Sequence, residues 1–229
     1  MDPLRLCLAL GPPAVYLLLV GAINLSRRAW VVSGPRDLAA LGVALAGPAV
    51  IGPIELFFPY SAAAAFGPYV WVLLLGLYFL CIILLALVMR PRLVVYNISS
   101  DEARDALTAV ASRLEREVLW SGDSIQFPDL GVQLGLEPFP AMRNVTLLAV
   151  GRGQSPHGWA RLERALAEEL HDTEVAPNLP AIQLILAATI TLVFLGIIVC
   201  QDPQAMTAGI LDLLQFDASQ VKPHSGFGS

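Results

Sequence analysis

The sequence predicts an α-helical multi-pass membrane protein with about four transmembrane helices and a small α+β domain between the last two. Two observations support this fold class. The chain is 56% hydrophobic and only 14% charged, whereas soluble domains are about 25% charged. The charge is also unevenly distributed, because residues 93–179 resemble an ordinary soluble sequence and the flanking stretches are nearly uncharged. A soluble protein with a large core has uncharged runs of at most about 10–14 residues, so that class is excluded.

The first predicted transmembrane helix covers residues 6–25 and is followed by Arg27 and Arg28. In a cleaved signal peptide the positive charges precede the apolar run, so we expect this segment to be retained. Pro12 and Pro13 lie inside it. Proline lacks a backbone donor and clashes with the preceding turn. We therefore expect a kink, or a regular helix that begins only near Pro12 and leaves the first span partly interfacial.

The second predicted helix covers residues 38–58 and is rich in glycine and alanine. Small residues allow lipid-embedded helices to approach closely, so we expect this helix inside the bundle. Glu55 lies near its far end. A carboxylate in hydrocarbon is costly and usually faces a partner or water. Glu55 is therefore either an interfacial residue beside an aromatic belt or, in the functional interpretation, part of an inter-helix contact or an ion pathway.

The third predicted helix, residues 69–89, consists mainly of bulky aliphatic residues, which indicates extensive exposure to lipid. The short connector 59–68 predicts an antiparallel hairpin of the second and third helices. The fourth predicted helix covers 180–201, with its apolar run at 181–200. After it, the apolar segment 206–216 has the composition of an interfacial helix or of a docking site for a partner subunit, and a flexible tail follows.

The arginines determine the predicted orientation. They follow the first helix, precede the second and follow the third, at Arg27, Arg28, Arg36, Arg90 and Arg92. By the positive-inside rule, these topology determinants place the domain 93–179 in the cytoplasm and both termini outside. Lys222 is the single lysine among 14 basic residues, which is typical of a GC-rich genome. We therefore expect a bacterial cytoplasmic (inner) membrane.

The domain 93–179 shows alternating strand and helix signals. A β-branched run at 93–98 predicts a buried strand, and Ser99 then begins an amphipathic helix that extends to about Arg116. A second amphipathic helix is expected at 157–171. Between the helices, short strands are expected at 118–120, 124–127, 131–136 and 144–150. This order predicts an antiparallel-rich sheet with both helices on one face, and a ferredoxin-like sandwich is the best named guess.

Little in the sequence points to chemistry. Arg152 and Gly153 lie in a strand-to-helix turn and form a weak anion-site candidate, but the turn matches neither the P-loop nor the GxGxxG pattern, and an ordinary turn is the simpler interpretation. The cysteines and histidines are scattered without metal-ligand spacing. No cofactor, metal or catalytic constellation is predicted. The net charge of −5 argues against nucleic acid as a partner.

The sequence favours a non-enzymatic membrane subunit that anchors or organises a larger complex. Its expected partners are the lipid bilayer and either other membrane subunits or further copies of itself. Two alternatives stay open. One is a small oligomeric transporter or channel that uses Glu55, and the other is a membrane-bound sensor whose cytoplasmic domain binds a ligand.

Overall fold

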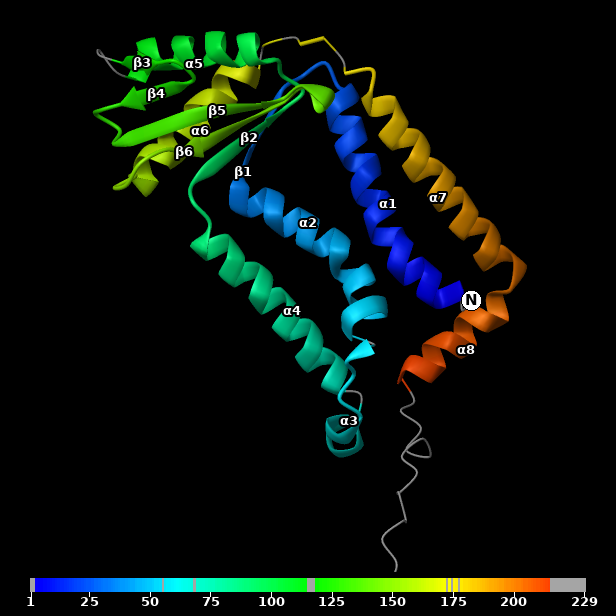
Figure 1. The fold of residues 1–229 in the computed structure, drawn as a ribbon. Helices are drawn as coiled ribbons and strands as arrows, with labels where there is room; N and C mark the ends of the chain where they lie inside the picture. Colours follow the sequence, from blue (N-terminus) through cyan, green and yellow to red (C-terminus); the bar gives the residue numbers. More distant parts are fainter. Residues whose placement is uncertain are drawn as a thin grey trace, which may run out of the picture. The chain divides into compact units, whose positions relative to one another are not determined.

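The computed structural model of the chain describes residues 3–54, 56–67, 69–114, 118–171, 173, 175–176 and 178–214. It contains apolar helices and a six-stranded antiparallel sheet (Figure 1). Four helical segments are long and apolar enough to cross a membrane: α1 (Pro3–Leu25), α2 with its π-helical extension (Gly34–Ile54), α4 (Tyr69–Val88) and α7 (Ala181–Gln201). The predicted combination of about four long apolar helices with an α+β region is therefore confirmed at this level of detail.

Helix α1 differs from its prediction, because it is helical from Pro3 and contains both prolines. The expectation of a regular helix beginning only near Pro12 is wrong. Pro12 has no N–H to donate to the Leu8 carbonyl one turn earlier, and Gly47 of α2 packs directly against that carbonyl. A neighbouring helix can compensate a carbonyl freed in this way, here through the close approach of the glycine Cα–H.

Helix α2 (Gly34–Ala49) begins earlier than predicted and passes into a π-helix, Val50–Ile54. Pro35 occupies the first turn, where a missing N–H costs nothing. Pro53 lies in the π-helix. The packing of α2 agrees with its small residues, because the Tyr78 hydroxyl of α4 donates to the Gly42 carbonyl at 2.7 Å.

Two shorter helices lie in segments for which the sequence predicted no membrane span. Helix α3 (Tyr60–Phe66) lies in the predicted connector between α2 and α4. Helix α8 (Pro203–Leu214) covers most of the apolar segment predicted after the fourth span. Its helical structure fits an interfacial or docking segment, and that role stays a prediction.

The sheet contains one strand that the predicted domain 93–179 did not include. Strand β1 (Trp30–Ser33) lies between α1 and α2 in the chain and pairs with β2. All neighbouring strands are antiparallel, in the order β1-β2-β6-β5-β4-β3. The other strands are β2 (Arg92–Tyr96), β3 (Leu119–Ser121), β4 (Ser124–Phe127), β5 (Val132–Phe139) and β6 (Asn144–Ala149).

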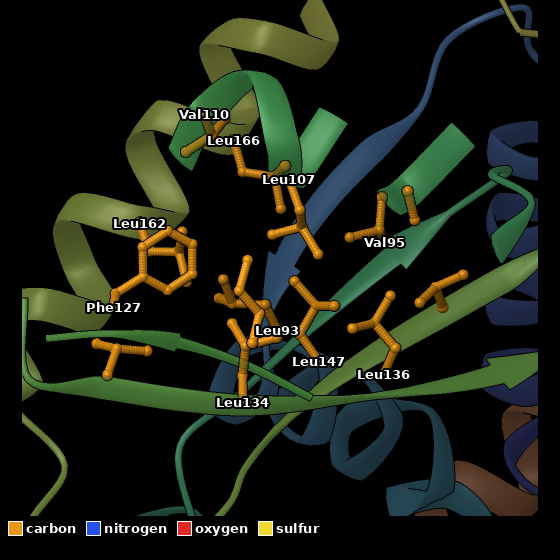
Figure 2. Close-up of a cluster of buried hydrophobic side chains, with 14 of the residues drawn as sticks. Leu93, Val95, Leu107, Val110, Phe127, Leu134, Leu136, Leu147, Leu162 and Leu166 are labelled. Atoms are coloured by element: carbon orange, nitrogen blue, oxygen red, sulfur yellow. The ribbon is translucent and has the colours of Figure 1, made fainter. Parts of the chain in front are cut away.

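Helices α5 (Ser100–Leu114) and α6 (Pro156–His171) pack on one face of the sheet, as predicted. Figure 2 shows this core, in which alternate strand residues such as Leu93, Leu134 and Leu147 meet Leu107 of α5 and Leu162 of α6. The other strand residues point to the opposite side, which α5 and α6 do not cover and which we call the helix-free face. Its members include Trp30, Arg92, Val94, Tyr96, Leu119, Gln126, Gln133, Glu137, Phe139 and Thr146.

The ferredoxin-like guess is wrong. That arrangement follows the order βαββαβ, with a helix between its third and fourth strands. Here β3, β4, β5 and β6 follow one another without an α-helix, and α6 comes after all of them. Tight connections such as Ser121–Ser124, with Gly122 at φ 61°, leave no length for a crossover helix, so sequential strands pair as a meander.

Helix α5 begins with a capping box. The Glu102 backbone N–H donates to the Ser99 hydroxyl at 3.3 Å, and the Ser99 backbone N–H donates to the Glu102 carboxylate at 2.8 Å, which satisfies donors at the helix start. Arg143, in the turn before β6, donates to the same carboxylate at 2.9 Å. Burial opposes ionisation of Glu102, but the bonds from Ser99 and Arg143 outweigh it and lower its pKa.

Replacing Gly47 by alanine should destabilise the packing of α1 against α2, because the new β-carbon would overlap the Leu8 carbonyl oxygen. Overpacking of this kind costs about 1–3 kcal/mol. The measurement is thermal unfolding of the full chain in detergent. The control is Gly76→Ala in α4, where a β-carbon meets nothing within 4 Å. Equal unfolding temperatures for the two variants would contradict the close contact.

Glu102→Gln should reduce the loss of stability in acid. Because the pKa of Glu102 is lowered by folding, its carboxylate stabilises the fold above the unfolded value of 4.5, and this contribution disappears as the pH falls through the lower folded pKa. Denaturant unfolding between pH 7 and 3 measures the effect. The solvent-exposed Glu168→Gln variant of α6 is the control, and it should follow the wild-type pH profile.

Candidate functional site

The main polar cluster outside the sheet core lies where α2 meets the helix-free face. Asp37, in the first turn of α2, accepts a hydrogen bond of 2.5 Å from the Tyr96 hydroxyl and forms an ion pair with Arg92 at 3.5 Å. Both partners come from β2. The start of a helix also favours a carboxylate through its dipole. We call Asp37, Arg92 and Tyr96 the junction cluster.

Burial, followed by the hydrogen bond to Asp37, raises the pKa of Tyr96 well above its ordinary value. The phenol therefore remains protonated and acts as a donor at physiological pH. Tyr16 of α1 has a side-chain hydrogen-bond interaction with Tyr96. The side chains of Arg92 and Asp37 are 29% and 20% exposed, so water screens their pairing less than that of a surface pair.

A second set of hydrogen bonds joins the sheet to the end of α1. Asn97, just after β2, is fully buried and has a left-handed φ of 58°, which asparagine tolerates better than most residues. Its side-chain amide donates to the Ser26 carbonyl at 2.5 Å, and its backbone N–H donates to the Asn144 side chain at 3.1 Å. The end of α1 and the β5–β6 connection are thus fixed to one residue.

The segment that precedes α7 bonds to the end of α1. The Val175 backbone N–H donates to the Arg27 carbonyl at 3.1 Å, and the Asn178 N–H donates to the Asn24 carbonyl at 3.0 Å. Asn24 and Asn178 are both buried. Backbone bonds therefore connect the start of the fourth candidate span to the end of the first.

The five arginines predicted as topology determinants all lie at the sheet end of an apolar helix. Arg27, Arg28 and Arg90 are exposed. Arg36 pairs with Glu163 of α6 at 2.9 Å, but its side chain is 75% exposed, and such a pair contributes little to stability. Arg92 also has the structural role described above. Sequence reasoning missed its partner Asp37, because the predicted helix began at residue 38 and the structure begins it at Gly34.

Arg152 and Gly153 line a shallow hollow of about 140 Å³ beside β4 and β5. Two donors of this turn bond within the protein: the Ser155 backbone N–H donates to the Gly131 carbonyl at 3.0 Å, and the Gln154 side-chain amide donates to the Val150 carbonyl at 2.6 Å. Its side-chain acceptors are also occupied. Ser155 caps α6 by accepting from the Gly158 N–H at 3.1 Å, and the Gln154 side chain bridges the Gln133 N–H and the Trp159 indole. These bonds support an ordinary turn, and the anion site stays a prediction.

Glu55 lies outside the described residues, so its place in hydrocarbon or at an interface stays a prediction. Within the described ranges, no group of three or more His, Cys, Asp or Glu side chains could bind a metal ion. Comparisons with family models, with curated proteins and with solved structures give no match for this chain. The junction cluster is therefore the arrangement from which a function can best be argued, and its chemistry is that of a fixed joint between α2 and the sheet.

A double-mutant cycle of Asp37→Ala and Tyr96→Phe should show energetic coupling. Each single change breaks the same hydrogen bond, so the losses should not add, and contacting pairs couple by about 0.5–3 kcal/mol. Denaturant unfolding in detergent, followed by tryptophan fluorescence, measures the free energies. Tyr96→Phe combined with Asp105→Asn, an exposed change on α5, is the control and should be additive. Additivity in both cycles would show that the junction bond does not form.

Proposed function

We propose that this chain is a non-enzymatic membrane subunit that fixes its sheet domain in one orientation at the membrane and thereby anchors or organises a larger complex. The sheet domain is the six-stranded sheet with α5 and α6. The observation that carries the proposal is the junction cluster. Asp37 joins the start of α2 to β2, and Asn97 joins the end of α1 to the same strand. A domain attached by a flexible linker would need neither connection.

The cellular placement follows from the same helix ends. The arginines Arg27, Arg28, Arg36, Arg90 and Arg92 all lie on the side of the sheet domain, which the positive-inside rule assigns to the cytoplasm. With an even number of spans, both termini then lie on the outer side. The arginine-rich composition supports a bacterial inner membrane.

The far end of the helix-free face supplies a surface for a protein partner. Leu119 of the edge strand β3 is 60% exposed, and it pairs with the exposed Gln126 of β4. An apolar side chain surrounded by polar ones is typical of a non-obligate interface, and an unpaired edge strand offers backbone groups as well. We propose that the partner subunit docks at β3 and β4.

Site-specific photo-crosslinking in membranes of cells that make the protein tests this function. A benzophenone amino acid at Gln126 should give one adduct of defined mass with another protein. The same probe at Arg161, exposed on α6, is the matched control and should give none. Leu119→Arg should abolish the Gln126 adduct without changing the amount of protein in the membrane. A monodisperse single chain with no adduct from Gln126 would contradict the proposal.

A further inference from the structure

Two large aromatic side chains are exposed at one end of the helix-free face. Trp30 of β1 is 51% exposed and Phe139 of β5 is 57% exposed. Their neighbour Val31 packs against the helix-covered core, so the alternation of β1 directs Trp30 to the opposite side. Phe139 likewise follows the outward-facing Glu137 at a spacing of two. The two rings are on β1 and β5, with β2 and β6 between them, and aromatic side chains at one level of a protein with apolar helices are typical of a membrane interface.

Both aromatics lie where the first candidate span ends. Trp30 follows α1, which ends at Leu25, after only a short connection. Phe139 pairs with Asn144, whose side chain accepts a hydrogen bond from Asn97, and Asn97 in turn donates to the Ser26 carbonyl. These contacts place the two rings at the level where α1 passes from apolar to polar sequence.

The direction of α2 shows which side of the sheet faces a bilayer. Asp37 and Gly34, at the start of α2, contact Arg92 of the helix-free face. The apolar helix therefore leaves the sheet from this face, and a bilayer crossed by α2 lies on the same side.

The charges fit this orientation. Arg27 and Arg28 are exposed next to Trp30 and can pair with lipid phosphates. Six acidic residues lie on the two covering helices α5 and α6, which pack on the side away from the helix-free face: Asp101, Glu102, Asp105, Glu163, Glu168 and Glu169. Glu137 is an acid on the helix-free face, but it lies two residues before Phe139 in β5. It is therefore farther than Phe139 from Asn144, which bonds to Asn97.

We propose that this end of the sheet lies in the phospholipid headgroup layer, with the Trp30 and Phe139 rings inserted among the lipids and Arg27 and Arg28 beside the phosphates. Tryptophan is enriched at this depth because its ring is apolar and its N–H is polar. The sheet domain thus makes its own lipid contact, in addition to the apolar helices. This contact concerns a different part of the helix-free face from the protein-docking surface at β3 and β4.

Depth-dependent fluorescence quenching of the full chain in nanodiscs tests the lipid contact. The discs contain phosphatidylcholine and phosphatidylglycerol, with or without a spin label on the headgroup. The chain has four tryptophans, so the Trp30 signal is obtained as the difference between the wild type and Trp30→Phe. The matched control is Trp120→Phe, because Trp120 lies at the other end of the sheet, beside Arg104 of α5.

The headgroup label should quench the Trp30 signal at least about twofold more than the Trp120 signal, as expected for an interfacial ring, whereas aqueous iodide should favour Trp120. Phe139→Trp should add a second signal that the headgroup label quenches, which gives an independent measurement if Trp30→Phe fails to fold. A Trp30 signal quenched by iodide and not by the lipid label would overturn the proposal in favour of water. A signal that neither agent reaches would overturn it in favour of a protein occupant.

Discussion

The hydrogen bond between Tyr96 and Asp37 joins the sheet to the start of α2, and the proposals made for this chain depend on it. It joins residues that are 59 positions apart, one in the first turn of an apolar helix and one at the end of a strand that follows another apolar helix. Because burial and the carboxylate both raise the pKa of Tyr96, the phenol keeps its proton and the bond is insensitive to pH over the physiological range. Asn97 adds a second attachment to the end of α1. Strand β2 and the residue after it thus bond to the start of α2 and to the end of α1.

A polar group removed from water must find a partner. This requirement also explains why Gly47 of α2 lies beside the turn of α1 that contains Pro12. Pro12 frees the Leu8 carbonyl inside α1, and Gly47 of α2 lies against that carbonyl. The glycine lets α2 approach the point at which the internal hydrogen bonds of α1 are interrupted. The glycine-rich composition of α2 is therefore connected to the proline pair of α1, although the two signals are far apart in the sequence.

The elements that could be predicted are those whose signal is local. The apolar lengths identified the four long helices, and the alternation around Val132, Leu134 and Leu136 identified a strand with one buried face. Strand β1 could not be found as easily, because it has four residues and its partner β2 lies beyond two apolar helices in the chain. Its run Trp30-Val31-Val32 carried a weak signal that the nearby arginines obscured. The ferredoxin-like guess failed for a similar reason, since strand order depends on pairing between distant segments. Asp37 was missed because the second helix was predicted to begin at residue 38, so this acid lay outside it, and its partners Arg92 and Tyr96 are far away in the sequence.

The two faces of the sheet differ in what they contact. Helices α5 and α6 cover one face, and the start of α2 contacts the other. Had α2 packed on the side of α5 and α6, their acidic surface would face the lipid phosphates, and like charges would repel. Instead, Asp37 binds Arg92 and Tyr96 from the helix-free face, and the acids of α5 and α6 lie on the covering helices, where Glu102, Glu163 and Glu169 pair with arginines. In the proposed arrangement, the end of the helix-free face with Trp30 and Phe139 contacts lipid, and the far end at β3 contacts a protein partner. The proposal therefore depends on one partly buried carboxylate, Asp37, because its bonds to Arg92 and Tyr96 are what join the start of α2 to the helix-free face.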